Sequence, residues 1–196
     1  HECVFAELGL DQDTWRYDHD EAWRLSLNKA YNDKAEKIVG RKLLSEKPAG
    51  HPPPFSPAPR ALYEIFEMEN IWDKVSQSWW LKQAANKPEE LSALLDRVEK
   101  RLENLRAFLL PEGWDKAKKE LVLKGAKVPR YAHQRGPVTF AMSLYGVENM
   151  IYLIMDDPGL AGRLRDLVLK AMIERISILD EEAGYTPQTA PKGFSF

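Results

Sequence analysis

The chain of 196 residues is poor in the residues that build disulfides and multi-thiolate metal sites. Cys3 is its only cysteine, which excludes an internal disulfide and any metal centre that needs several thiolates. Its four histidines, His1, His19, His51 and His133, do not pair at the spacings typical of metal ligands on a helix or hairpin. We therefore expect no metal in this chain. A single thiol also fits a cytoplasmic protein.

Long apolar runs and a dominant charge are absent too. No stretch approaches the ~20 apolar residues that a membrane helix needs, and no secretory signal is recognisable. The 28 Lys+Arg nearly balance the 30 Asp+Glu, so net charge gives no case for nucleic acid or an anionic membrane as a partner. The length fits one sizeable domain or part of a larger one. Because the sequence starts at His1 rather than methionine, we expect part of a longer protein.

Prolines divide the sequence into three parts. Residues 45–60 hold six prolines, which lack backbone donors and fix φ, so this stretch is predicted to be an extended connector. It separates a helical segment, 1–44, from a larger part, 61–196. Within the first part, apolar residues at helical spacing predict a helix over 20–39 that ends at Gly40.

The acidic run before that helix resembles a metal site only superficially. Asp18, His19, Asp20 and Glu21 are adjacent in sequence, and adjacent residues point in different directions on a helix. Acids ahead of a helix complement its dipole and cap it. We therefore favour capping over metal ligation here.

Tryptophans concentrate just after the connector. Apolar residues between Ala61 and Leu81 favour a helix. Trp79 and Trp80 would then lie on different faces of that helix, so at least one of them should contact something beyond the core beside it. Tertiary packing is one explanation, and a subunit interface in a homodimer is the other.

Further helices follow in the larger part. A leucine stripe predicts a helix from Asn86 to Pro111, and a second helix spans 114–124. The nearly continuous apolar run 147–155 is predicted to be buried. Asp156 or Asp157 is then predicted to cap a long helix, with Pro158 in its first turn, that runs to Gly184.

Three acids end this long helix. Asp180, Glu181 and Glu182 would stand at its negative end. A carboxylate site is one interpretation of this cluster, and solvent exposure is the one that we favour.

One stretch, 127–145, is organised differently. A short β-prone run near 128–133 is followed by a turn at Arg135, Gly136 and Pro137, and an apolar helix starts at about Thr139. A second strand is expected at 192–196. In α/β folds ligands bind at the carboxyl ends of strands, which is where His133, Gln134 and Arg135 would stand.

Three segments of the sequence resemble one enzyme superfamily. They read GPVTFAMSLYG, ENMIYLIMDDPGL and ILDEEAG, and they are similar to the uroporphyrinogen decarboxylase superfamily, which includes methyltransferases that move methyl groups from corrinoid proteins to coenzyme M. The resemblance implies an α/β fold, a (β/α)8 TIM barrel with a cleft at the carboxyl ends of its strands. Residues 61–196 would form the amino-terminal to middle part of that barrel.

The resemblance also implies a function and a set of site residues. Decarboxylases of this superfamily act on a carboxylate-bearing tetrapyrrole without a cofactor and hold its carboxylates with arginines. Arg135, with Arg130 nearby, would bind substrate because a guanidinium pairs a carboxylate bidentately, and His133 would act as acid or base. Ser143 stands where the decarboxylases carry a substrate-binding tyrosine, and Tyr145 follows two residues later. Alternatively, Arg135 forms a structural ion pair and His133 is a packed strand residue.

Two other functions remain open. A methyltransferase of the same superfamily would take its methyl group from a methyl-corrinoid protein and would hold zinc through a His-x-Cys motif and a later cysteine, all outside this chain. A non-catalytic helical partner-binding module is the second alternative. It is favoured by the tryptophan-rich segment and by the absence of the decarboxylases' arginine-containing glycine-rich motif.

Overall fold

The structure is a computed structural model that describes residues 2–48, 57–129, 134–186 and 188–190. Contacts divide the chain into two compact units. The first holds the helices that precede the proline-rich connector together with the hairpin tip Trp72–Trp80, and the second holds the remaining described residues.

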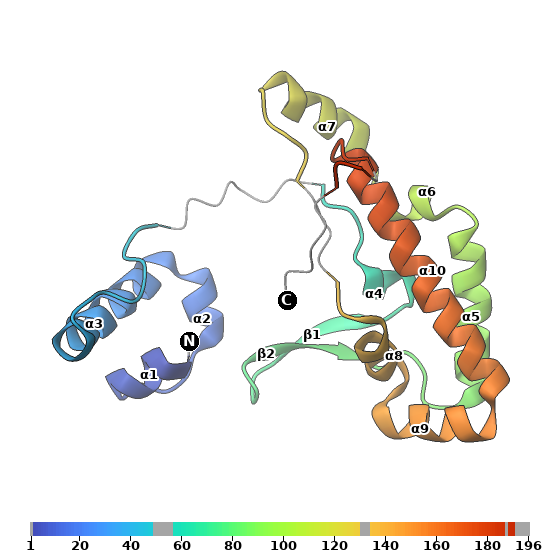
Figure 1. The fold of residues 1–196 in the computed structure, drawn as a ribbon, viewed down its shortest axis with the longest axis horizontal. Helices are drawn as coiled ribbons and strands as arrows, with labels where there is room; N and C mark the ends of the chain where they lie inside the picture. Colours follow the sequence, from blue (N-terminus) through green and yellow to red (C-terminus); the bar gives the residue numbers. More distant parts are fainter. Residues whose placement is uncertain (1, 49–56, 130–133, 187, 191–196) are drawn as a thin grey trace. The chain divides into compact units, whose positions relative to one another are not determined.

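The first unit contains α1 (Glu2–Leu8), α2 (Thr14–His19) and α3 (Glu21–Val39) (Figure 1). The side chain of Asp20 accepts a hydrogen bond from the backbone N–H of Trp23 at 2.9 Å, and Gly40 ends α3 at φ 71°. Both the helix predicted at 20–39 and the capping role of the acids before it are confirmed. A small core joins the three helices, made of Val4, Phe5, Tyr17 and Leu27.

One buried amide fixes the chain that leaves α3. Asn32 is fully buried, and its Oδ1 accepts hydrogen bonds from the backbone N–H groups of Leu43 (2.9 Å) and Leu44 (3.0 Å). Its Nδ2 donates to the Leu44 carbonyl and to Glu46. All of the amide's polar atoms therefore have partners, as a buried amide requires, and residues 43–46 are held against α3.

The second unit is built around two long helices. Its elements are α4 (Leu62–Ile65), parts of the strands β1 (Glu69–Asp73) and β2 (Ser78–Lys82), and the helices α5 (Pro88–Leu102), α6 (Leu105–Leu109), α7 (Trp114–Leu123), α8 (Pro137–Tyr145), α9 (Val147–Asp156) and α10 (Pro158–Glu182). Helix α10 runs along α5 and also contacts α4, α6, α8 and α9 (Figure 1).

The core of this unit follows the predicted stripe. Every member of the stripe is buried: Leu91, Leu94, Leu95, Val98, Leu102, Leu105 and Leu109. They pack against Leu164, Val168 and Ala171 of α10, whose first turn is capped by the Asp157 side chain. The helices predicted at 114–124 and after Asp157 are likewise confirmed.

A single glycine joins α8 to α9. Gly146 has φ 88°, which a side-chain-bearing residue rarely adopts. A Cβ at this position would lie 2.4 Å from Nε2 of Gln83. The two helices meet there at 98°.

The helix predicted between 61 and 81 is wrong. Only Leu62–Ile65 is helical, and the residues from Glu69 onward form the β1–β2 hairpin. The carboxylate of Asp73 accepts from the backbone N–H groups of Val75 and Ser76, which stabilises the turn. Isoleucine and tryptophan fit strands at least as well as helices, so their spacing alone did not decide between the two.

The predicted TIM barrel is also wrong. Of the described residues, 62% are helical, and they contain one antiparallel sheet of two strands. The first residues of the strand predicted at 128–133 form no strand, and Pro129 there lacks the N–H that a sheet ladder needs. Residues 130–133 and the strand predicted at 192–196 lie outside the described residues.

The acids at the end of α10 are not all exposed, contrary to our expectation. Glu182 retains 8% of its surface, and its carboxylate accepts from Trp114 Nε1 (2.8 Å), Lys118 Nζ (2.8 Å) and Arg106. Burial raises the pKa of Glu182, but these donors outweigh it and lower the pKa. Glu182 therefore ties α6, α7 and α10 together and is not a free carboxylate site.

Across the described ranges, no single helix is long and apolar enough to cross a membrane. By length and composition alone, α8 and α9 taken together could form a span, but this pair of helices is sharply bent.

A bidentate ion pair supports the start of the hairpin and generates a pH prediction. Arg97 donates to Glu67 through Nε (3.0 Å) and Nη2 (2.8 Å), and Arg101 donates through Nη2 at 2.7 Å. Hydrogen bonds from Arg97 are the largest cause that lowers the pKa of Glu67 from 4.5 to about 2. A depressed carboxyl pKa stabilises the fold above the unfolded pKa, and this stability is lost as pH falls toward the folded pKa.

We therefore expect Glu67→Gln to lower the free energy of unfolding at pH 7 by about 1 kcal/mol. This is less than full linkage would give, because the side chain is one-third exposed. The difference between variant and wild type should shrink from pH 5 to pH 2 in urea melts. Glu69→Gln, which removes an exposed pair with Lys82, is the control and should change little. A difference independent of pH would contradict this role of Glu67.

Candidate functional site

The structure brings two of the predicted substrate-binding residues together beside α8. Arg135 Nη1 donates to Ser143 Oγ at 3.2 Å, and Ser143 Oγ donates to the Thr139 carbonyl at 2.9 Å. Tyr145 is buried in the core, and burial raises the pKa of its hydroxyl. A ligand beside Arg135 would therefore meet Ser143 and not the Tyr145 ring.

The other two predicted residues, Arg130 and His133, lie outside the described residues. Their predicted roles as substrate ligand and acid or base stay predictions. Arg135 is exposed, and no carboxylate of the described chain lies within ion-pair distance of it. The structural ion pair proposed as an alternative for Arg135 therefore has no partner in the described ranges.

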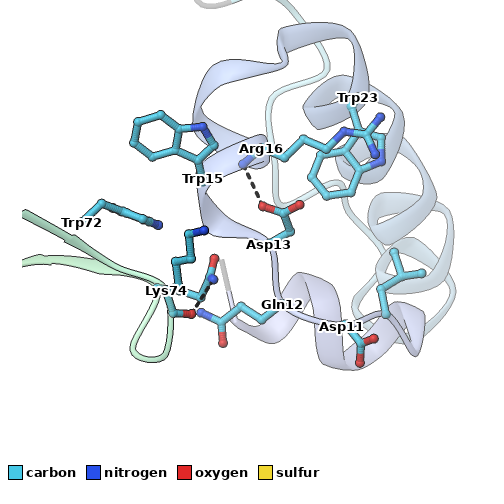
Figure 2. A pocket seen from close by; sticks show the side chains of 10 residues that line it. Asp11, Gln12, Asp13, Trp15, Arg16, Trp23, Trp72 and Lys74 are labelled. Carbon is cyan, nitrogen blue, oxygen red and sulfur yellow. Dashed lines mark hydrogen bonds between the residues drawn. The ribbon is translucent and has the colours of Figure 1, made fainter.

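The first unit contains a cleft of about 840 Å³ (Figure 2). Its walls come from the α1–α2 link, from α2 and α3, and from the hairpin tip. The lining residues are Leu10, Asp11, Gln12, Asp13, Trp15, Arg16, Trp23, Trp72, Lys74 and Gln77. The volume lies within the range of small-molecule sites.

The aromatic side chains at the cleft pack against one another. Ring centroids lie 5.2 Å apart for Trp15 and Trp72, 5.8 Å for Trp15 and Trp79, and 5.5 Å for Trp72 and Trp79. His19 stacks on Trp15 at 3.9 Å. These are ordinary aromatic contact distances, so no space remains between the rings for the cation of an aromatic cage.

Several polar groups of the cleft are also engaged. Asp13 accepts from the Arg16 backbone N–H, and the Arg16 guanidinium lies 4.4 Å from the Trp23 ring centre. Gln77 Oε1 accepts from the Thr14 backbone N–H at 3.1 Å. Together with the indole contacts, these bonds fasten the hairpin tip to α2. The cleft is therefore primarily a packing junction, and we assign it no ligand.

A third candidate lies on α9, where the sequence predicted burial. That prediction is wrong: Leu153 is buried, but Val147, Ile151, Ile154 and Met155 are between 53% and 74% exposed. Their spacing of i, i+4, i+7 and i+8 puts them in one stripe. Leu153 packs into the core with the partly buried Met150, so α9 has a second apolar face. We call this stripe of four residues the outer face of α9.

The outer face has an acidic border. Glu148, Tyr152 and Asp156 follow one another at spacings of four and thus form a line along one flank of the stripe. Glu148, Tyr152 and Asp156 are exposed, and no ion pair joins either acid to the described residues. No lysine or arginine occurs between Gly136 and Gly162.

The described residues contain no group of three or more histidine, cysteine or acidic side chains that could hold a metal ion. Our expectation of no metal or cofactor in this chain stays a prediction.

Comparisons with known proteins identify no relative. No protein-family model, curated protein or solved structure matches the chain.

The packing junction of the first unit yields a prediction. Trp15→Ala should remove the contacts with Trp72, Trp79 and His19 and release the hairpin tip. Because the ring is partly exposed, we expect the free energy of unfolding to fall by about 1–3 kcal/mol, less than for the loss of a fully buried tryptophan. Faster amide exchange over residues 72–80 and weaker near-ultraviolet dichroism would report it.

Val75→Ala is the control, because Val75 lies in the same hairpin tip and its side chain is 93% exposed. It should leave exchange in the tip almost unchanged. If the two variants behaved alike, the junction would not depend on Trp15.

Proposed function

We propose that the protein is a non-catalytic partner-binding module whose second unit binds another polypeptide through the outer face of α9. One observation carries this proposal. A helix of ten residues exposes four large apolar side chains in a single stripe while its opposite side is packed into the core.

Exposure of such an apolar stripe to water is unfavourable, and stripes of this kind commonly bind other polypeptides. Each large apolar side chain gains about 1.5–3 kcal/mol when it is moved fully from water into an apolar contact. Contiguous exposed apolar surface marks interaction sites in folded proteins. Residues at i, i+4, i+7 and i+8 are the anchors by which helices pair with other helices or with grooves. The spacing therefore supports a helical or groove-forming partner.

A synthetic helix tests this proposal directly. The probe is a dye-labelled peptide of about 20 residues with a leucine stripe at helical spacing and uncharged glutamine and alanine elsewhere, since shorter helices are marginal in water. We expect wild-type protein to bind it in anisotropy titrations. The double variant Ile151→Gln with Ile154→Gln should bind at least about 10-fold more weakly, which corresponds to 1.4 kcal/mol of lost apolar contact.

Folding should be unaffected by this double variant, because both residues are more than half exposed. The control is Leu123→Gln, which removes a still more exposed apolar side chain from the end of α7. It should bind the peptide as wild type does. Equal binding by all three proteins, or binding by none, would overturn the proposal.

A second candidate function rests on Arg135. We propose that the start of α8 binds a substrate carboxylate, as the resemblance to uroporphyrinogen decarboxylases implies. What supports this is the exposed guanidinium, which donates a hydrogen bond to the neutral hydroxyl of Ser143. A guanidinium that is not neutralised by a neighbouring acid can pair bidentately with a ligand. The methyltransferase alternative stays a prediction, because its zinc ligands are expected outside this chain.

Arginine and lysine variants separate binding from support of the fold. In titrations with uroporphyrin, a carboxylate-rich tetrapyrrole, Arg135→Lys should lower the binding affinity nearly as much as Arg135→Ala does. The reason is that lysine cannot form the bidentate pair that arginine forms with a carboxylate. The loss should be about 10- to 150-fold, the equivalent of roughly 1.5–3 kcal/mol. Thermal melts should not change. Unchanged affinity with a lower melting temperature would instead assign Arg135 to the scaffold.

A further inference from the structure

We infer that the polypeptide bound by the outer face of α9 is an amphipathic helix with lysine or arginine along one flank of its apolar stripe. This inference rests on the proposed partner-binding function and adds the chemistry of the partner. It follows from the charges that border the outer face.

The border is one-sided. Glu148 and Asp156 lie eight residues apart, about 12 Å or two turns along the helix axis, with the Tyr152 ring between them on the same flank. Asp156 also stands at the carboxyl end of α9, where the helix dipole adds negative potential. A partner helix lying along the stripe would therefore meet negative charge along one side only.

Both acids are available to such a partner. Neither forms an ion pair with the described residues, and both are exposed. The neighbouring Asp157 differs, because its Oδ1 accepts from the Leu160 N–H and caps α10 at 2.9 Å. Basic side chains seven or eight positions apart on a partner helix would reach Glu148 and Asp156 together. The Tyr152 ring between them offers a face for a cation.

The same charges disfavour two other occupants. If α9 paired antiparallel with α9 of a second copy around a two-fold axis, the acidic flank of one helix would lie against that of the other, and like charges would repel. An anionic membrane surface attracts basic residues around an apolar helix face. The segment from Gly136 to Gly162 has none. A basic helix satisfies both the stripe and its border.

Three dye-labelled peptides test the inference. They share one leucine stripe and differ only in two flanking positions, eight residues apart, that carry arginine, glutamine or glutamate. Anisotropy titrations against the whole chain at low salt should rank arginine above glutamine above glutamate. We expect the arginine peptide to bind about 3- to 10-fold more tightly than the glutamine peptide, which is the gain that two exposed ion pairs would give. Raising the salt to 0.3 M should reduce that preference.

Charge-removing variants identify the acids responsible. The double variant Glu148→Gln with Asp156→Asn should bind the arginine and glutamine peptides equally, while its affinity for the glutamine peptide stays that of wild type. Glu120→Gln, an exposed acid on α7, is the matched control and should keep the full preference. Preference retained in the double variant would overturn the inference.

The outcomes distinguish this inference from the function on which it rests. If no peptide binds, the proposed function itself fails. If all three peptides bind equally, the partner-binding function stands and the basic flank is wrong. Two further results would overturn the inference. One is a dimer in sedimentation velocity that Ile151→Gln dissolves, and the other is binding to phosphatidylglycerol vesicles that Ile151→Gln abolishes.

Discussion

The second unit depends on the apolar seam between α5 and α10. The leucines of α5 interlock with Leu164, Val168 and Ala171, and the other helices of the unit attach to this pair. Helix α6 extends the seam, and the ion pairs of Glu182 anchor α6 and α7 to the far end of α10. Polar interactions thus hold α6 and α7, which the apolar contact between α5 and α10 covers only in part. Burial of apolar surface is the dominant favourable term in such an arrangement.

Helices with a single apolar face could be predicted from sequence. The stripe from Leu91 to Leu109 alternates with charged residues at the helical period, so its burial followed directly. Capping by the acids before α3, and by Asp156 or Asp157 before α10, could also be predicted, because a cap depends on neighbouring backbone N–H groups. The structure assigns these caps to Asp20 and Asp157. The hairpin could not be predicted, because tryptophan and isoleucine fit a helix as well as a strand. Its turn is stabilised by Asp73.

The candidate site could not be predicted, for a related reason. A run such as 147–155, which is apolar except for Glu148 and Asn149, predicts burial only if neighbours surround it. Here the core covers one side of α9, which periodicity cannot show. The barrel was expected from a resemblance to short segments, and those segments form helices in this structure. Arg135 lies just before α8 and Ser143 near its carboxyl end, so their contact depends on how the long arginine side chain lies against the helix, which spacing in the sequence does not show.

The backbone conformation of Gly146 has a consequence for how variation in this protein should be interpreted. The direction in which α9 leaves α8 is set by one position whose φ of 88° a residue with a side chain rarely adopts. A substitution there would rotate the outer face while leaving every residue of that face intact. Loss of partner binding could thus map to a residue that contacts no partner. In selection experiments, position 146 should therefore stay glycine whichever residue stands at position 83.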